Sequence, residues 1–166
     1  MTKQPLRVDA GTLNQHGPRE GQMLVQQILK SKADDGVVTI APDESLAAAA
    51  KLLAARRIGA VVVSPDGKTV AGIVSERDIV REIAQKGAGC LVDMLDGVMT
   101  RDIVTCSRDD TSDAVLGLMT QGRFRHLPVV EGAEMIGLIS IGDVVKAQLA
   151  TLAMEKEALE GMIKGF

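Results

Sequence analysis

The stretch GIVSERDIV at residues 72–80 recurs as GLISIGDVV at residues 137–145, which is 65 residues later (137 − 72). A shorter match pairs Val38 and Thr39 with Val104 and Thr105, at an offset of 66 residues (104 − 38). One residue has therefore been lost between the two matches. A supersecondary unit of this length buries little apolar surface alone, so we expect the two copies to complete a core by packing together.

Each copy has the same predicted order of elements, namely a short strand, a helix, two consecutive strands and a second helix. In the first copy the expected elements are a helical turn near Val25, a strand at 37–40, a helix at 44–56 capped by Asp43, strands at 60–63 and 69–74, and a helix from Ser75 to Gly87. In the second copy they are a helical turn at 92–99, a strand at 103–106, a helix carrying Val115, Leu116 and Met119, strands at 127–130 and 135–139, and a helix from Ser140. A helical crossover favours parallel neighbours and a short turn favours a hairpin, so the predicted fold class is α+β, with β-α-β-β-α twice.

The composition argues against several classes of partner. The formal net charge is −3 and aromatic residues make up 1% of the chain, so neither electrostatic attraction to nucleic acid nor base stacking is expected. No apolar run approaches the ~20 residues of a membrane span, and residues 1–22 lack the apolar core of a signal peptide. We therefore expect a cytoplasmic protein with a flexible N-terminal arm, no membrane partner and no nucleic-acid partner.

The two cysteines have no spacing typical of a metal site. Cys106 takes the position of Ile40 in the first copy, which predicts a core thiol. Cys90 follows Gly87-Ala88-Gly89, and this glycine-rich connector suggests an exposed thiol. No metal is expected.

The repeated motif Gly-x-x-Ser-x-x-Asp places Ser75 and Asp78, and again Ser140 and Asp143, at the start of a helix. The free N–H groups of a first helical turn attract anions, and a carboxylate beside them can accept hydrogen bonds from a vicinal diol such as ribose. The same spacing is also that of a capping box, which is purely structural. Because both copies carry the motif after a strand glycine that leaves room for a ligand or backbone, we favour the binding interpretation.

Arg123, Arg125 and His126 lie directly before the strand at 127–130. Positive groups here could clamp a phosphate, although a solvated corner between helix and strand is the alternative. The first copy has Gly59 and Ala60 where the second has Arg125 and His126, so the two copies are not chemically equivalent.

These motifs resemble those of tandem CBS (cystathionine β-synthase) domain pairs, also called Bateman modules. The resemblance covers about residues 23–149, and its marks are RRIGAVVV at 56–63 and RFRHLPVV at 123–130 together with the Ser/Asp motifs. It implies two sheets packed about a pseudo-twofold axis and clefts between the copies that bind AMP, ADP, ATP or, in some members, NAD(H) or S-adenosylmethionine. It also implies a homodimer, with an effector protein that the sequence does not name.

By this resemblance the candidate ligand-binding residues divide into three groups. Ser75, Asp78, Ser140 and Asp143 would hold the ribose; Arg77, Arg123, Arg125 and His126 would approach phosphates; Val38 and Val104 would flank adenine. No Ser-His-Asp set or carboxylate pair predicts catalysis, so we expect a regulatory module without a required cofactor. A dimeric scaffold that binds no ligand is the alternative.

The chain is expected to divide into an arm at 1–22, repeats at 23–88 and 89–150, and a helical extension at 151–166. Along the last helix, Val145, Leu149, Leu152, Lys156, Leu159 and Ile163 are spaced 4, 3, 4, 3 and 4. This heptad stripe predicts either packing on the helix's own domain or contact with a second subunit.

Overall fold

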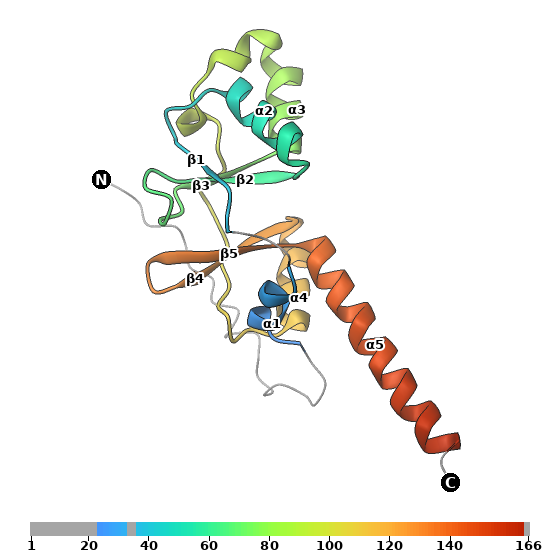
Figure 1. Ribbon diagram of the computed structural model, residues 1–166. Helices are drawn as coiled ribbons and strands as arrows, with labels where there is room; N and C mark the ends of the chain where they lie inside the picture. Colours follow the sequence, from blue (N-terminus) through green and yellow to red (C-terminus); the bar gives the residue numbers. More distant parts are fainter. Residues whose placement is uncertain (1–22, 33–35, 165–166) are drawn as a thin grey trace. The chain divides into compact units, whose positions relative to one another are not determined.

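The computed structural model describes residues 23–32 and 36–164, and the chain forms two compact units (Figure 1). The first unit is built around Asp35–Val104 together with Glu131–Ile136. The second is built around Thr105–Val130 and Gly137–Phe166, together with the segment that carries helix α1. The arm predicted at 1–22 lies outside the described residues.

The first unit has the predicted β-α-β-β-α order. Its elements are β1 (Thr39–Ile40), α2 (Leu46–Arg56), β2 (Ala60–Val63), β3 (Gly72–Ser75) and α3 (Glu76–Lys86). Strand β2 lies in the middle of the sheet, parallel to β1 and antiparallel to β3. All four residues of β2 are buried, as a continuous apolar strand with both faces covered requires.

Helix α2 begins two residues later than the sequence suggested, because Ser45 rather than Asp43 caps it. The Ser45 hydroxyl accepts a hydrogen bond from Ala48 N at 3.1 Å. In the second unit Thr111 caps α4 (Ser112–Gly122) in the same way, with Ala114 N donating at 3.2 Å. At the other end of the first unit, Gly87 ends α3 with a φ of 77°, as predicted.

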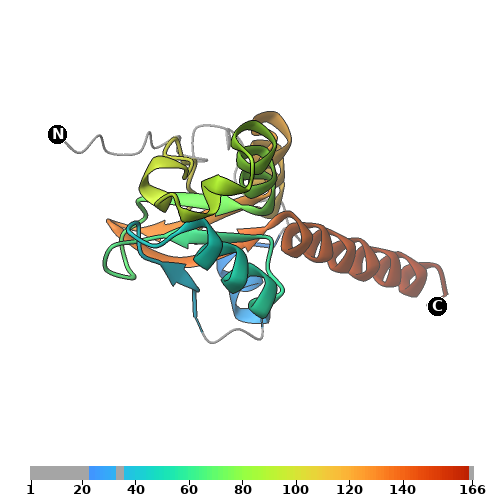
Figure 2. The same ribbon diagram turned by 90° about the horizontal axis from the view of Figure 1, so that it is seen from above.

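The second unit repeats the pattern with a weaker first strand. It contains α4, most of the hairpin of β4 (His126–Glu131) and β5 (Glu134–Ser140), and the long helix α5 (Ile141–Lys164), which is also seen in Figure 2. The tip of this hairpin, residues 131–136, belongs to the first unit. The strand predicted at 103–106 is reduced to one parallel bridge between Cys106 and Val129, which corresponds to the pairing of Ile40 with Val63 in the first unit. The helical turn predicted at 92–99 is confirmed only in the short 3-10 segment η3 (Leu95–Gly97), and a second 3-10 segment, η2 (Ala88–Val92), lies before it.

Each unit is completed by a segment that precedes the other repeat. Helix α1 (Val25–Ser31) joins the second unit through Val25 N, which donates to Asp110 O at 2.9 Å. Segment η3 joins the first unit through Leu95 N, which donates to Glu44 O at 2.9 Å. The two acceptors, Asp110 and Glu44, are equivalent positions of the repeat, 66 residues apart (110 − 44). Each unit is therefore completed in the same way, by a segment from in front of the other repeat. The repeat limits at 23–88 and 89–150 stay a prediction.

Both cysteines are buried, at 2% exposure each. This confirms the core thiol predicted at Cys106, whose pKa is raised by burial and further by the nearby charge of Asp110. The exposure expected for Cys90 is wrong, because η2 folds this residue into the core of the first unit with Leu53 and Leu95.

None of the helices in residues 23–32 and 36–164 combines the length and apolar character that a bilayer crossing requires. Within those residues, no group of three or more His, Cys, Asp or Glu side chains is placed to hold a metal ion.

Candidate functional site

At the start of α3, Asp78 and Ser75 form a reciprocal cap. Asp78 Oδ2 accepts hydrogen bonds from Ser75 N at 2.8 Å and from Ser75 Oγ at 3.0 Å, while Asp78 N donates to Ser75 Oγ at 3.3 Å. The other carboxylate oxygen, Oδ1, accepts from Arg81 Nη2 at 2.5 Å. Only 10% of the Asp78 side chain is exposed, so the ion pair and the cap compensate the cost of burying its charge.

At the start of α5, Asp143 makes the same cap but takes its cation from a distant part of the chain. Asp143 Oδ2 accepts from Ser140 N at 2.9 Å, and Asp143 N donates to Ser140 Oγ at 3.1 Å. Lys32, at the end of α1, places Nζ 2.8 Å from Asp143 Oδ2 and donates to Leu138 O at 2.9 Å. The pair is about three-quarters buried, with 28% of the Lys32 side chain and 22% of the Asp143 side chain exposed.

This environment holds the pKa of Asp143 below its usual value. Burial raises the pKa. The hydrogen bond from Lys32, the hydrogen bond from Ser140 N and the positive charge of Lys32 all lower it, and their sum is larger than the effect of burial. The carboxylate is therefore firmly ionised at neutral pH. Sequence reasoning missed Lys32, because nothing in its local pattern shows that α1 packs on the second unit.

The structure confirms the capping interpretation of the Ser/Asp motif, since both carboxylates close a capping box. Capping and ligand binding are compatible in principle, because each carboxylate has two oxygens and several acceptor positions. Among the described residues, Asp143 makes its hydrogen bonds through Oδ2, which leaves Oδ1 as an acceptor. The role of these residues toward ribose stays a prediction.

The strand glycines do not leave open space for a ligand. A Cβ at Gly72 would lie 2.5 Å from the Met99 sulfur, and one at Gly137 would lie 2.7 Å from Leu29 Cδ2. Met99 lies shortly after η3, and Leu29 lies in α1. Segment η3 and helix α1 are the two segments that complete the units. The expectation that these glycines make room for a ligand or backbone is therefore wrong: they admit side chains that lock these two segments in place.

The basic segment lies directly beside the start of α5. Arg125 O accepts a hydrogen bond from Ile141 N at 2.8 Å, and this places the segment next to Ser140 and Asp143. Arg123 is exposed at the C-cap of α4, in the left-handed region with a φ of 55°; Arg125 is exposed, and His126 is half-buried as the first residue of β4. In the first unit Glu76 N makes the equivalent bond to Gly59 O at 3.0 Å, but no cationic side chain stands at that position.

The remaining candidate ligand-binding residues are Arg77, Val38 and Val104. Arg77 is exposed in the first turn of α3. Val38 is half-buried and packs against the core of the first unit, and Val104 is half-buried two residues before Cys106. Their predicted roles toward phosphate and adenine stay predictions.

Sequence and structure relate the chain to known proteins over most of its length. The model of the CBS domain family matches residues 27–85 and 95–150. The mitochondrial CBS domain-containing protein CBSX3 of Arabidopsis thaliana is 32% identical over 148 residues, covering 85% of this chain and 72% of that protein. Other Arabidopsis relatives are longer, and the chain spans 25% of one and 31% of another.

Solved structures agree with this assignment. A CBS-domain containing protein from Agrobacterium tumefaciens is 45% identical with a TM-score of 0.70, covering 75% of this chain and 98% of that one. A CBS domain protein from Pyrobaculum aerophilum, solved as a complex with AMP, is 25% identical with a TM-score of 0.64, covering 73% and 89%. With two matched domains and the observed β-α-β-β-α order in the first unit, the chain belongs to the CBS domain family as a tandem pair.

Proposed function

We propose that this CBS pair is a regulatory module that binds an adenosine-containing ligand at its Ser/Asp helix entrances. The observation that carries the proposal is the hydrogen bond between Ile141 N and Arg125 O, which brings a basic segment next to the Ser140–Asp143 helix start. Ribose and phosphate are linked in a nucleotide, so a site for both needs a carboxylate and cations on adjacent segments.

The chemistry of the second entrance suits a nucleotide better than that of the first. Asp143 offers an ionised carboxylate to ribose hydroxyls, and the first turn of α5 favours an anion. Arg123, Arg125 and His126 supply cationic or hydrogen-bonding groups for phosphate. The Pyrobaculum relative's complex with AMP supports an adenosine-containing ligand. In the first unit Arg77 would be the phosphate contact, because Gly59 and Ala60 replace the basic pair.

The ligand would act by shifting an equilibrium rather than by undergoing reaction. A ligand changes the population of two arrangements only by its differential affinity for them. We propose AMP, ADP, ATP or NAD(H) as the ligand, a homodimer as the responding assembly, and a separate effector protein as the target. The module would then be regulatory and not catalytic.

Calorimetric titration with AMP and ATP tests the proposal. Asp143→Asn should weaken AMP binding at least tenfold, because an amide keeps the shape of the carboxylate but loses half of its acceptor capacity and its charge. Asp78→Asn should weaken binding at the first entrance to a similar degree.

Asp110→Asn is the matched control. Asp110 Oδ2 accepts from Ser107 N at 2.7 Å, so its carboxylate makes the same kind of bond to a backbone N–H three residues earlier, in the turn before α4 and without belonging to the proposed site. It should lose stability while keeping AMP affinity. If Asp143→Asn and Asp110→Asn bind AMP equally well, the carboxylate at the entrance is only a cap and the proposal fails.

A ligand-free scaffold is the second candidate, and the closed capping boxes favour it. In that case the melting temperature would be the same with and without millimolar nucleotide, whereas a ligand that binds only the folded state must raise it.

A further inference from the structure

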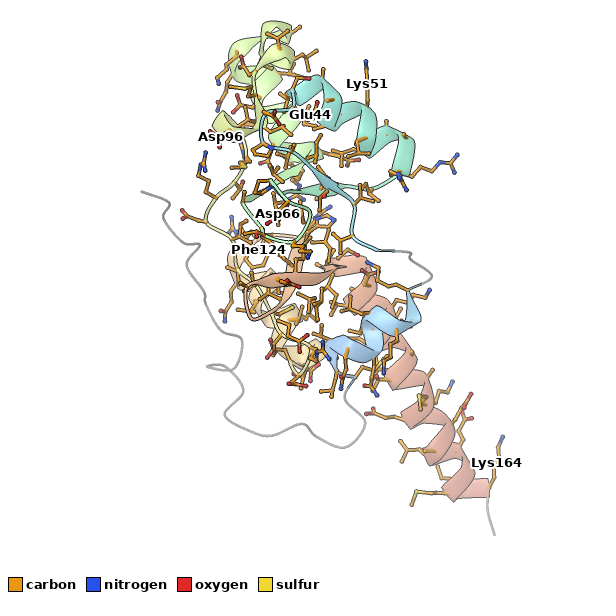
Figure 3. All side chains as sticks on the ribbon, turned by 60° about the vertical axis from the view of Figure 1, so that its left-hand side comes forward. Glu44, Lys51, Asp66, Asp96, Phe124 and Lys164 are labelled. Carbon is orange, nitrogen blue, oxygen red and sulfur yellow. The ribbon has the colours of Figure 1, made fainter. Side chains whose placement is uncertain are left out.

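The second half of α5 has no cover in its own unit. The first turns pack against the unit through Val144 and Ala147, which are buried, and through Gln148, which bonds Ser112 Oγ at 3.3 Å and also Asp113 Oδ1. Every residue from 152 to 164 is exposed. Figure 3 shows side chains projecting from this part of the helix up to the labelled Lys164, with no neighbouring element.

The heptad stripe that the sequence indicated starts at Val145 in the first half of α5 and continues through the exposed second half to Ile163. Its apolar members are all open to solvent, at Val145 44%, Leu149 62%, Leu152 58%, Leu159 61% and Ile163 84%. Packing of the stripe on its own domain is therefore wrong. Helices in proteins owe most of their stability to a packed apolar face, so a continuous helix with this stripe in water requires a partner.

We propose that this partner is α5 of a second copy of the chain, lying antiparallel. In heptad terms Leu149, Lys156 and Ile163 take the a positions, and Val145, Leu152 and Leu159 take the d positions. An antiparallel pair sets a against d. The register that sets Leu149 against the partner's Leu159 also sets Val145 against the partner's Ile163 and Lys156 against the partner's Leu152. All six core positions are then matched over about 27 Å of helix.

The flanking charges select this orientation. A parallel pair would place Lys156 against the partner's Lys156, and Glu155 at g beside the partner's Glu160 at e, so that like charges face each other at both places. The antiparallel register instead places Lys146 beside the partner's Glu160, and symmetry provides this attraction twice. It retains one contact between like charges, Glu155 with the partner's Glu155, which lies next to the Lys156 side chains.

The pairing thus sets Val145, Leu149, Leu159 and Ile163 against apolar side chains of the partner and brings Lys146 to the partner's Glu160. This self-complementarity is why a second copy is the partner rather than an unrelated helix. With less than three heptads and a lysine in the core, the pair should be weak and concentration-dependent. The inference does not depend on nucleotide binding.

Disulfide trapping tests the register on the full chain. In the antiparallel pair, Leu149 and the partner's Leu159 face each other, whereas Leu149 and the partner's Leu149 are about 15 Å apart along the axis. A mixture of Leu149→Cys and Leu159→Cys chains should form a mixed disulfide, and each variant alone should form none, because a disulfide needs Cα atoms within about 7 Å. The native Cys90 and Cys106 are buried and add little background. Disulfide dimers of each variant alone, or no mixed dimer, overturn the proposal.

Sedimentation equilibrium tests the interface energetically. Leu152→Glu should raise the dimer dissociation constant at least tenfold, and Lys156→Leu should lower it. Met154→Glu is the control, because Met154 is 71% exposed but lies at f, on the face opposite the stripe. Since all three residues are exposed, none of the changes should alter folding, and circular dichroism checks this. Equal dissociation constants for Leu152→Glu and Met154→Glu would place any dimer contact elsewhere and overturn the proposal.

Discussion

The ion pair between Lys32 and Asp143 makes a quantitative prediction about the docking of α1. Lys32→Met keeps most of the apolar stem but removes the ammonium, and with it the 2.8 Å contact to Asp143 Oδ2 and the 2.9 Å hydrogen bond to Leu138 O. Exposed ion pairs contribute about 0.2–1 kcal/mol, and hydrogen bonds to charged groups about 1.5–3 kcal/mol. For a pair that is about three-quarters buried, we expect a loss of about 1 kcal/mol at pH 7, or about 2–4 °C in melting temperature.

The loss should depend on pH in a defined direction. The pKa of Asp143 is lower in the folded chain than its ordinary value of 3.8, so the stabilisation is fully present above about pH 4 and disappears as the pH falls below that value through the folded pKa. The difference between wild type and Lys32→Met should therefore shrink toward zero in acid. Denaturant unfolding at pH 7 and at about pH 3 measures it.

Lys30→Met is the matched control, because Lys30 lies in the last turn of α1, two residues before Lys32, and is exposed. It should change the free energy of unfolding by less than about 0.5 kcal/mol at either pH. If Lys32→Met is no more destabilising than Lys30→Met at pH 7, or if its penalty is unchanged in acid, then the ion pair does not hold α1 on the second unit.

Two further predictions concern packing and capping. Gly137→Ala should lower the free energy of unfolding by about 1–3 kcal/mol, because its new methyl group would meet Leu29 Cδ2 at 2.7 Å. Gly117→Ala, in a helix with nothing within 4 Å of the new methyl group, should raise it by up to about 1 kcal/mol. Thermal unfolding of both variants compares them. Ser45→Ala should cost about 1 kcal/mol through the lost cap of α2, while Asp43→Ala should be nearly neutral; the opposite order in denaturant titrations would show that Asp43 is the cap after all.

Features that depend on residues close in the sequence were predictable. The helix starts at Ser75 and Ser140 were visible because serine and an acidic residue three positions later satisfy free N–H groups within one turn. The burial of Cys106 followed from its alignment with Ile40, since equivalent positions of a repeat share an environment. The misplaced start of α2 arose because Asp43 and Ser45 are both residue types that cap helices well, and the local sequence does not decide between them.

Features that join distant segments were not predictable. Cys90 seemed exposed because glycine-rich connectors usually are, but η2 folds it under α2 and α3. Gly72 and Gly137 suggested open space, and the side chains that fill it come from Met99 and Leu29, in segments with no local signal of where they pack.

The amino-acid sequence by itself determined the repeated β-α-β-β-α order, the two Ser/Asp helix entrances and the family, because each rests on periodicity or on contacts within a few residues. Tertiary structure alone decided that α1 completes the second unit, that Lys32 neutralises Asp143 and that the stripe of α5 is uncovered. These outcomes depend on which segments meet across more than 80 residues, and the free energy of such contacts comes from burial and ion pairing that local patterns do not encode.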